Sequence, residues 1–283
     1  GGKGLIGGEV GEEDFLTHLL TANTHDYILF FTDKGRVFQT RVYEIPVASR
    51  TSKGKSIHNF LEIPSEENIS AIVTYQSVAK GEKAGYLVMA TKAGMIKKTK
   101  LEDFENVRRS GIIAIGLKKG DLLHEVKFSI GDGEVILTTV NGQAIRFKES
   151  QLRPMGRSAA GVKGIRLKNT DSLASLDIIE KDKKKTNFLV ITANGFGKQP
   201  PLSEYKVQSR GGSGIKTAKI TSKTGMIIGA QILVEETELL ALSAKGQIIR
   251  VGLGDVRRAS RATQGVRIMR VAAHDKLIGV VCF

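Results

Sequence analysis

The residues best suited to chemistry are arginines that stand beside glycines in short basic loops. In Arg210-Gly211-Gly212-Ser213-Gly214 the glycines permit positive φ, so that successive backbone N–H groups can turn toward one anion. The arginine adds a planar guanidinium whose donors match the oxygens of a phosphate group. This combination predicts contacts with phosphates and indicates no bond-making chemistry.

The basic loop recurs along the chain at a nearly fixed distance from a second glycine. We call turn glycines those that end a Thr/Ser-x-x-Gly turn after an apolar run, namely Gly35, Gly94, Gly142, Gly195 and Gly246. The loop glycines follow 19, 17, 19, 19 and 19 residues later, at Gly54, Gly111, Gly161, Gly214 and Gly265. An arginine stands four residues before the loop glycine in four of these five repeats, and Arg108 and Arg109 fill the shorter loop. Such agreement identifies a repeat protein.

The loops supply a set of candidate phosphate-binding residues, which are predicted to form one ring of positive charge. They are Gly1, Gly2, Lys3, Gly4, Arg50, Lys53, Lys55, Arg108, Arg109, Arg157, Lys163, Arg210, Lys216, Arg261 and Arg267. A net charge of +14 and a pI near 9.8 favour a polyanionic partner, with nucleic acid first and an anionic membrane surface second. The plainer alternatives are a generally lysine-rich composition, glycines that only make tight turns, and arginines that pack between neighbouring units.

Each repeat predicts four β-strands, because apolar runs bracket a short glycine turn and two further runs follow the basic loop. The third strand is expected directly after the loop glycine, at residues 112–115, 165–167, 215–220 and 266–271. Helical periodicity is confined to two short stretches, residues 12–20 and 101–107. Four strands per roughly 50 residues predict an all-β radial array of blades that share their apolar cores.

The whole chain, 1–283, is predicted to be a single domain with one partial and five complete repeats. Their approximate bounds are 1–25, 26–84, 85–132, 133–186, 187–236 and 237–283. Gly1-Gly2-Lys3-Gly4 parallels Gly211 to Gly214, and the hairpin that should precede it is absent, so we expect a fragment of a longer protein. Residues 180–185 are expected to form a solvated loop between blades.

Other kinds of site receive little support from the sequence. Residues 49–56 resemble a phosphate-binding P-loop, but Ser49 replaces its first glycine and a strand follows it. The five histidines lack ligand spacing, so that neither a metal nor a cofactor is expected, and no catalytic set emerges. The single cysteine, Cys282, excludes a disulfide framework and predicts a reducing compartment. No apolar segment is long enough to span a membrane.

Three segments carry a resemblance to a known family. The runs Tyr27 to Val37 and Val42 to Pro46, together with Gly1 to Gly4, resemble the C-terminal domain of the DNA gyrase A subunit. The last of these is similar to the end of that family's basic box, although the Gln-Arg-Arg of the box is missing. The resemblance implies a six-bladed β-pinwheel whose blades exchange strands, with the box on an outer loop that is needed for wrapping DNA.

The resemblance also implies partners and a setting. Duplex DNA would be bound and wrapped without sequence readout, and the wrap would give the parent enzyme, an ATP-dependent type II topoisomerase, its negative-supercoiling activity. The gyrase B subunit, with the rest of the gyrase A subunit, would complete an A2B2 heterotetramer in the cytoplasm, with the nucleoid, and the isolated domain would be a monomer. The cleaving tyrosine and the ATPase would lie outside this chain. The alternatives are the equivalent domain of topoisomerase IV and a protein-binding propeller.

Overall fold

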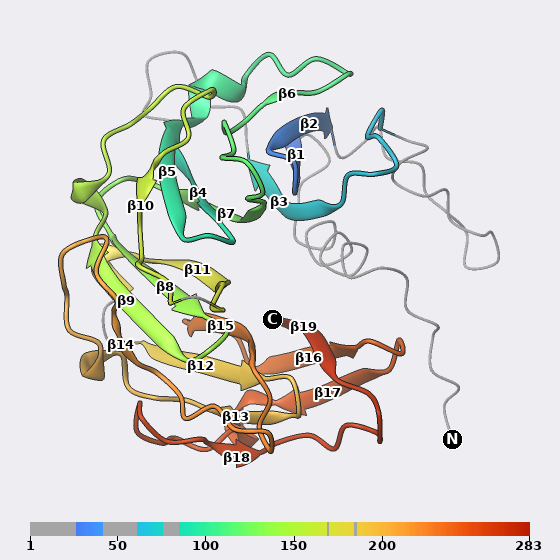
Figure 1. The fold of residues 1–283 in the computed structure, drawn as a ribbon, viewed down its shortest axis with the longest axis vertical. Helices are drawn as coiled ribbons and strands as arrows, with labels where there is room; N and C mark the ends of the chain where they lie inside the picture. Colours follow the sequence, from blue (N-terminus) through green and yellow to red (C-terminus); the bar gives the residue numbers. More distant parts are fainter. Residues whose placement is uncertain (1–26, 42–60, 76–84, 169, 184–185) are drawn as a thin grey trace.

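The computed structural model describes residues 27–41, 61–75, 85–168, 170–183 and 186–283. Within them the chain forms five antiparallel sheets, which we call blades 1 to 5, arranged radially in an arc (Figure 1). From the centre outward, blade 1 contains β3 (Ile69–Tyr75), β1 (Tyr27–Thr32), β2 (Arg36–Arg41) and β6 (Ile112–Ile113). Blade 2 contains β7 (Leu123–Ser129), β4 (Tyr86–Thr91), β5 (Met95–Lys100) and β10 (Val162–Lys163).

The other three blades have the same order of strands. Blade 3 contains β11 (Leu173–Ile179), β8 (Glu134–Thr139), β9 (Gln143–Lys148) and β14 (Ile215–Lys216). Blade 4 contains β15 (Ile227–Leu233), β12 (Asn187–Thr192), β13 (Phe196–Lys198) and β18 (Val266–Arg267). Blade 5 has three strands among the described residues, β19 (Leu277–Cys282), β16 (Glu238–Ser243) and β17 (Ile248–Gly252).

The outermost strand of each complete blade comes from the following repeat. These exchanged strands are β6, β10, β14 and β18, and each has two residues that pair antiparallel with the second hairpin strand of the preceding blade. For example, Ile215 lies opposite Ala144, and Val266 lies opposite Gly197. Each repeat therefore completes its neighbour's sheet, which confirms the strand exchange that the resemblance implied.

The turn residues that repeat in the sequence explain how the hairpins close. In each described repeat the Thr or Ser hydroxyl accepts the N–H of the residue four positions later, as when Thr192 Oγ1 accepts Phe196 N at 3.2 Å. At Gly195, φ is +83°, and a Cβ there would lie 2.5 Å from the carbonyl oxygen of Met269 in the next repeat. This turn therefore needs glycine both for its backbone conformation and for the close approach of the exchanged segment.

The hydrophobic core lies in separate clusters between adjacent blades. Leu87 and Met89 of β4 pack with blade 1 residues, whereas Val88 and Ala90 of the same strand pack with residues of blade 3. Alternation of side chains along a strand thus places apolar groups on both faces of the blade. Blades buried on both faces require continuous apolar strands, which is why the first hairpin strands show no polar alternation.

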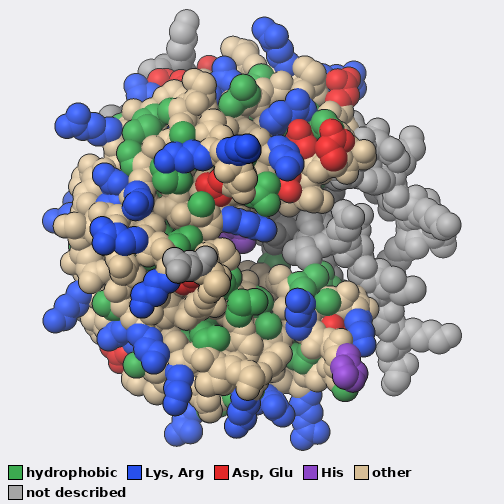
Figure 2. Space-filling model, viewed as in Figure 1, with side chains coloured by type: hydrophobic (Ala, Val, Ile, Leu, Met, Phe, Trp, Pro, Cys, Tyr) green, Lys and Arg blue, Asp and Glu red, His purple; other side chains and the backbone are tan. Residues whose placement is uncertain are grey.

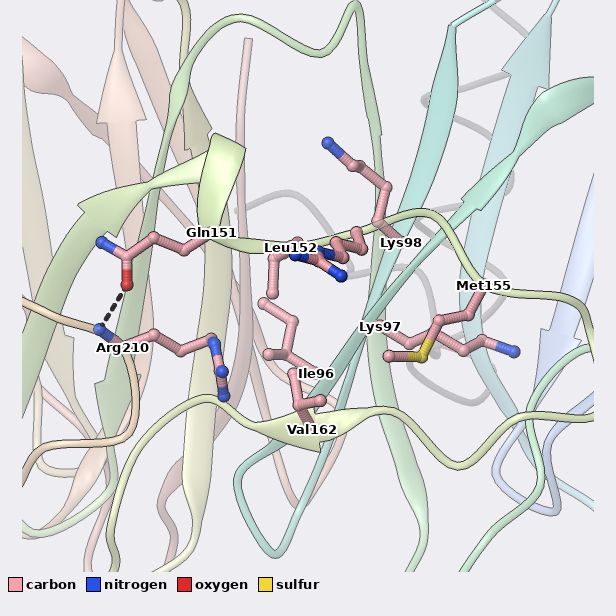
Figure 3. A pocket seen from close by; sticks show the side chains of 9 residues that line it. Ile96, Lys97, Lys98, Gln151, Leu152, Met155, Val162 and Arg210 are labelled. Carbon is pink, nitrogen blue, oxygen red and sulfur yellow. Dashed lines mark hydrogen bonds between the residues drawn. The ribbon is translucent and has the colours of Figure 1, made fainter.

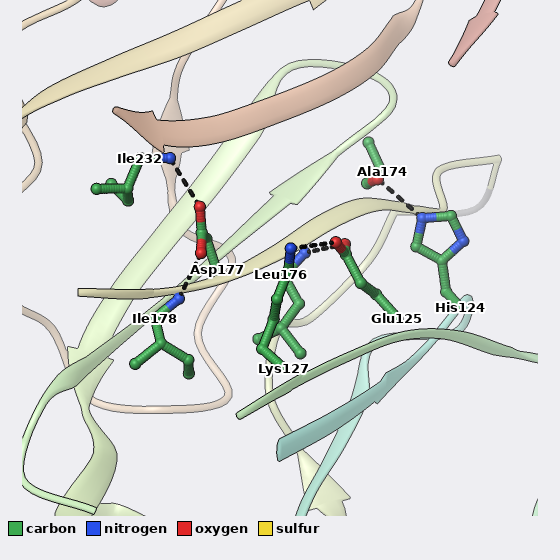
Figure 4. Close-up of polar contacts among 8 residues, drawn as sticks. All are labelled: His124, Glu125, Lys127, Ala174, Leu176, Asp177, Ile178 and Ile232. Carbon is green, nitrogen blue, oxygen red and sulfur yellow. Dashed lines mark hydrogen bonds and ion pairs between the residues drawn. The ribbon is translucent and has the colours of Figure 1, made fainter. Parts of the chain in front are cut away.

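Polar side chains join the inner strands of neighbouring blades near the centre (Figure 4). Glu125 of β7 accepts the backbone N–H of Leu176 at 2.8 Å, and Asp177 of β11 accepts that of Ile232 at 2.7 Å. Burial raises the pKa of Asp177 to about 6, and Lys127 opposes that shift. These bonds satisfy backbone groups of inner strands that would otherwise lack a ladder partner.

Several expectations about elements need correction. The strands after the loop glycines are two residues long, and the one expected at 165–167 lies at Val162–Lys163. The chain leaves the sheet after two residues because it must turn back over the neighbouring hairpin, where Gly35 and its equivalents accept its N–H groups. The helix expected at 101–107 is a short 3-10 helix, η2 (Leu101–Phe104), and residues 12–20 lie outside the described residues.

Similar 3-10 helices follow the second hairpin strand in three later blades, namely η3 (Glu149–Gln151), η5 (Leu202–Glu204) and η6 (Leu253–Asp255). A further one, η4 (Lys181–Lys183), is exposed and lies in the segment for which the sequence predicts a solvated loop. The described residues form five blades, and a sixth is not among them.

Candidate nucleic-acid interface

The four described basic loops lie on the outer edge of the arc. We call residues 105–111, 156–161, 209–214 and 260–265 the rim loops. In the last three, the approach to the loop runs parallel to the second hairpin strand of the preceding blade, with the bridges Lys98 to Pro154, Arg146 to Val207 and Gln199 to Arg258. The rim loops therefore occupy equivalent positions on successive blades, as the sequence spacing predicted.

The loop arginines that share a fixed spacing in the sequence make the same hydrogen bond between adjacent blades. Nη1 of Arg157 donates to the carbonyl oxygen of Ile113 at 3.1 Å, and Nη1 of Arg210 donates to that of Lys163 at 2.6 Å. Arg261 makes the same bond to Lys216. All three acceptors are the second residue of an exchanged strand, and all three arginines are half-buried. Part of each guanidinium is thus committed to holding one rim loop against the next.

Among the predicted phosphate-binding residues that the structure describes, the exposed cations are the second residues of the exchanged strands and the arginines of the shorter loop. They are Lys163, Lys216, Arg267, Arg108 and Arg109. In blade 1 the position of Lys163 is taken by Ile113, which is exposed and apolar. Figure 2 shows Lys and Arg side chains around much of the outer edge of this face. Gly1, Gly2, Lys3, Gly4, Arg50, Lys53 and Lys55 lie outside the described residues.

Two buried lysines under the rim loops escaped sequence reasoning. Lys97 and Lys198 each stand three residues after a turn glycine, and each is 1% exposed. Nζ of Lys97 donates to the carbonyl oxygens of Ala114 at 2.6 Å, Gly156 at 3.1 Å and Arg157 at 2.7 Å. Burial, followed by the charge of Arg157, lowers the pKa of Lys97 to about 8. The available signal was the position itself, three residues after a turn glycine, which is lysine in these two repeats and Phe38, Ile145 or Ile249 in the other three.

Other buried charges are paired within or between blades. Arg146 binds Glu134 through Nε at 2.7 Å, and its Nη1 donates to the carbonyl oxygens of Leu202 at 3.1 Å and Tyr205 at 3.0 Å. These bonds tie blade 3 to the segment that leads into the rim loop of blade 4's repeat. Because further hydrogen bonds satisfy the pair, it serves the architecture and offers nothing to a ligand.

A shallow cleft of about 160 Å³ opens beside one rim loop (Figure 3). Its walls include Ile96 and Val162, and its cations are Lys97, Lys98, Arg153 and Arg210. Of these, Lys98 is buried and pairs with the carboxylate of Glu149 at 3.6 Å, whereas Arg153 is exposed. The backbone N–H of Arg210 donates to Oε1 of Gln151 at 2.8 Å, which fixes the start of this loop. The cleft is cationic and open, so it suits a surface contact with an anion and lacks the enclosure of a small-molecule site.

The described residues hold no cluster of three or more His, Cys, Asp or Glu side chains that could bind a metal. Burial raises the pKa of the Cys282 thiol to about 12, which argues against a reactive role. In the part of the chain that the structure describes, no helix has the length and apolarity to cross a membrane.

Radial four-stranded blades that exchange their outer strands define a propeller-like repeat protein of the β-pinwheel class. The family model described as "DNA gyrase C-terminal domain, beta-propeller" matches the chain five times, at residues 26–72, 85–127, 133–180, 186–233 and 237–283. The chain therefore belongs to the DNA gyrase C-terminal domain family.

Curated relatives agree with this assignment. The DNA gyrase A subunit of Mycolicibacterium smegmatis is 42% identical over 282 residues, covering 99% of this chain and 33% of the relative. The DNA gyrase A subunit of Staphylococcus epidermidis is 42% identical over 271 residues, covering 96% of this chain and 30% of the relative. The chain thus spans about a third of the length of the curated relatives it matches.

Solved structures show the same architecture. The C-terminal domain of a DNA topoisomerase IV superposes with a TM-score of 0.81 at 28% identity, covering 92% of this chain and 80% of that one. A DNA gyrase A C-terminal domain gives 0.79 at 25% identity, covering 93% and 84%. The two structural comparisons are nearly equal, so it is the sequence relatives that favour gyrase.

Proposed function

We propose that this domain binds duplex DNA without reading its sequence and bends it around the outer edge of the blades. The observation that carries the proposal is the recurrence of the rim loops at equivalent positions on the outer edge of successive blades. A rod-like polyanion that touches each loop in turn would have to follow the curvature of the arc. Contacts through exposed Lys and Arg suit phosphates, which carry no sequence information.

The energetics require several contacts. Bending a duplex of 20–30 base pairs through 40–90° costs on the order of 1–6 kcal/mol. A single exposed phosphate contact is too weak to offset that cost, whereas a series of loops can share it. Within the described residues no α-helix is present to enter the major groove, which agrees with binding through the backbone.

The edge of blade 5 supports a sixth blade. The outer edge of β17 has no partner strand among the described residues, whereas the equivalent edge in blades 1 to 4 is covered by an exchanged strand. By the same spacing, the residue after loop glycine Gly4 is the expected partner of Ile248, which is the second residue after turn glycine Gly246. We propose that the first repeat joins blade 5 in this way and continues the ring.

In the longer protein, this domain would belong to an A2B2 enzyme made of the gyrase A and gyrase B subunits. The proposed wrap would present a DNA segment to that enzyme and so give it negative-supercoiling activity. The equivalent domain of topoisomerase IV is the second candidate, because the structural comparison with it is equally good. Supercoiling of relaxed plasmid by the complete enzyme distinguishes the two, since gyrase alone of the pair introduces negative supercoils.

A matched pair of double variants tests the DNA path. Lys163→Gln/Lys216→Gln removes two exposed rim charges, whereas Lys181→Gln/Lys183→Gln removes two exposed charges from η4. There Lys183 pairs with Glu180 and lines a hollow beside inner-strand residues such as Asp177, not a rim loop. We expect the rim variant to weaken duplex binding and to make the slope of log K against log salt shallower by about 2, because each phosphate contact contributes about 0.9. DNA circles ligated in its presence should also trap less writhe than with the wild type.

The η4 variant should match the wild type in both measurements. If the two double variants weakened binding equally, DNA would be held by the net charge of the domain and not by the rim loops. If neither variant had an effect, the rim would be excluded as the DNA path. A protein-binding propeller, the remaining alternative, would show no steep salt dependence with DNA.

A further inference from the structure

Two rim loops from different repeats each direct two carbonyl oxygens at equivalent positions onto a buried ammonium group; the third acceptor differs and is Ala114 for Lys97 and Thr263 for Lys198. Nζ of Lys198 donates to the carbonyl oxygens of Ser260 at 3.1 Å, Arg261 at 2.6 Å and Thr263 at 2.6 Å. Ser260 and Arg261 occupy the positions of Gly156 and Arg157, counted back from their loop glycines, and those two residues hold Lys97. The arrangement therefore occurs at two equivalent places and follows from the loop architecture.

The direction of these carbonyls fixes the direction of the next N–H groups. In a trans peptide the C=O and the following N–H point in opposite directions. Because the carbonyl of Arg157 faces Lys97 and that of Arg261 faces Lys198, the N–H groups of Ser158 and Ala262 point away from the buried ammonium. Ser158 and Ala262 are exposed, and neither N–H has a protein partner within the described residues.

The loop that lacks the lysine has the opposite peptide orientation. Ile145 occupies the position of Lys97 and Lys198, beneath the loop of Arg210. There the N–H of Gly211, the equivalent of Ala262, donates inward to the carbonyl of Gly164 at 2.8 Å, and φ of Gly211 is +84°. Isoleucine has no donor for an inward-facing carbonyl, so burying that carbonyl over Ile145 would leave it unpaired. Glycine at position 211 permits the flipped peptide instead.

We infer that Lys97 and Lys198 are positioning residues that turn the N–H groups of Ser158 and Ala262 outward, where each donates to a phosphate oxygen of the bound nucleic acid. This inference rests on the proposed function and deepens it by naming the donors at two of the rim loops. The ammonium group stays buried and acts through the peptide that it orients. Backbone N–H donors in such turns suit anions because they are fixed and need no side-chain ordering.

The charged groups around each lysine fit this role. Glu204 and Arg261 face Lys198 from blade 4's own 3-10 helix and from the rim loop, and Asp103 and Arg157 face Lys97. Glu204 also accepts the backbone N–H of Arg261 at 2.6 Å. The carbonyl of Ser260 faces Lys198, so the N–H of Arg261 in the same peptide unit points away from the ammonium, toward Glu204. The ammonium and the carboxylate thus hold opposite sides of this peptide unit and fix the loop just before Ala262.

Two variants of the lysine separate positioning from simple stability. Lys198→Ile removes the ammonium, and Lys198→Ile/Ala262→Gly also supplies the glycine that accompanies Ile145 in the other loop. We expect Lys198→Ile to lower the midpoint of chemical unfolding and the double variant to recover it. Both should bind duplex DNA about tenfold more weakly than the wild type, the loss expected for one hydrogen bond to a charged group. Lys181→Gln, which removes one exposed charge, is the control for net charge.

Amide exchange of residue 262 reports the peptide orientation without DNA. It should be fast in the wild type and slow in the double variant, as for Gly211 in the wild type. Fast exchange in the double variant, or unfolding of both variants, would overturn the inference. A slow amide with DNA affinity equal to that of Lys181→Gln would overturn the phosphate contact, and the separate Lys163/Lys216 experiment would show whether the rim itself still binds DNA.

Discussion

Burying a charged lysine costs folding free energy, and this cost makes the unfolding free energy of the domain depend on pH. Burial is the main cause that lowers the pKa of Lys198 to about 8, Glu204 opposes the shift, and Arg261 adds to it. An unfolded lysine keeps its proton up to about pH 10.4. Between these values the unfolded chain binds more protons than the folded chain, so folding is favoured as the pH rises.

We therefore predict that the wild type gains about 2–3 kcal/mol of unfolding free energy relative to Lys198→Ile/Ala262→Gly between pH 8 and pH 10.5. Urea unfolding of both proteins at several pH values measures the difference. Lys181→Gln, whose lysine is exposed, should show a constant difference from the wild type over the same range. A flat difference for the double variant as well would mean that Lys198 titrates normally.

The loop arginines hold neighbouring blades together as well as carrying positive charge, and their spacing alone did not reveal the first role. Arg157, Arg210 and Arg261 each donate one bond to a neighbouring exchanged strand, which is the inter-blade packing that the sequence left open as an alternative. Removing one of them would alter the loop as well as its charge. Lys163 and Lys216 are the cleaner probes of DNA contact, because their side chains are exposed and only their backbone carbonyls take part in these bonds.

The hairpin and the exchanged strand form a single structural unit, although they belong to different repeats. The carbonyl of Gly195 accepts the N–H groups of Ile268 at 2.9 Å and Met269 at 3.2 Å, so that the turn of one repeat anchors the returning chain of the next. The Thr/Ser-x-x-Gly signature is thus a docking site for the neighbour as well as a hairpin turn. This accounts for its presence in every described repeat.

Two glycine variants test this anchoring. Gly195→Ala should destabilise the domain by about 2–5 kcal/mol, because φ is positive and the new Cβ would meet the backbone oxygen of Met269 at 2.5 Å. Gly120→Ala should cost only about 1–2 kcal/mol, because φ is +81° there and no atom lies within 4 Å. Chemical denaturation measures both. Equal losses would show that the contact with the next repeat contributes nothing.

At the scale of the whole molecule, the arc of blades ends at the outer edge of blade 5 among the described residues. Blades 1 to 4 are joined to their successors by an exchanged strand and a shared core cluster, and side-chain bonds also join the inner strands of blades 1 to 4. Among the described residues, by contrast, no strand covers the outer edge of β17 in blade 5, and exposed edges of this kind invite pairing with another strand. Pairing with the chain's own first repeat would satisfy that edge and extend the path available to DNA.

A cysteine cross-link tests this continuation. In a Cys282→Ser background, Leu5→Cys/Ile248→Cys should form a disulfide on mild oxidation if the proposed pairing repeats the register of blade 4, in which the corresponding residues, Val266 and Gly197, lie opposite each other. Leu5→Cys/Ile278→Cys, with its second cysteine on the inner strand β19, should stay reduced in the monomer. Mass spectrometry of the monomer detects both. Cross-linking of the control pair to the same extent would contradict the proposed register.

The repeat phase, the hairpins and the position of the loops on one edge followed from the sequence alone. These features depend on short-range rules: Thr192 and Gly195 close a turn within four residues, and apolar runs such as 188–192 specify buried strands. Periodicity then placed every loop in an equivalent position, because identical units stack identically.

The tertiary structure decided which blade receives each short strand, what each loop arginine binds and why Lys198 is a lysine. Those facts depend on contacts between residues 44 to 74 positions apart, such as Arg157 with Ile113 and Arg36 with Ser110, which no local pattern encodes. A lysine in a strand has the same appearance in sequence whether it is solvated or buried. Only the neighbouring blade supplies the carbonyl oxygens that make Lys198 an internal support for a loop of the next repeat.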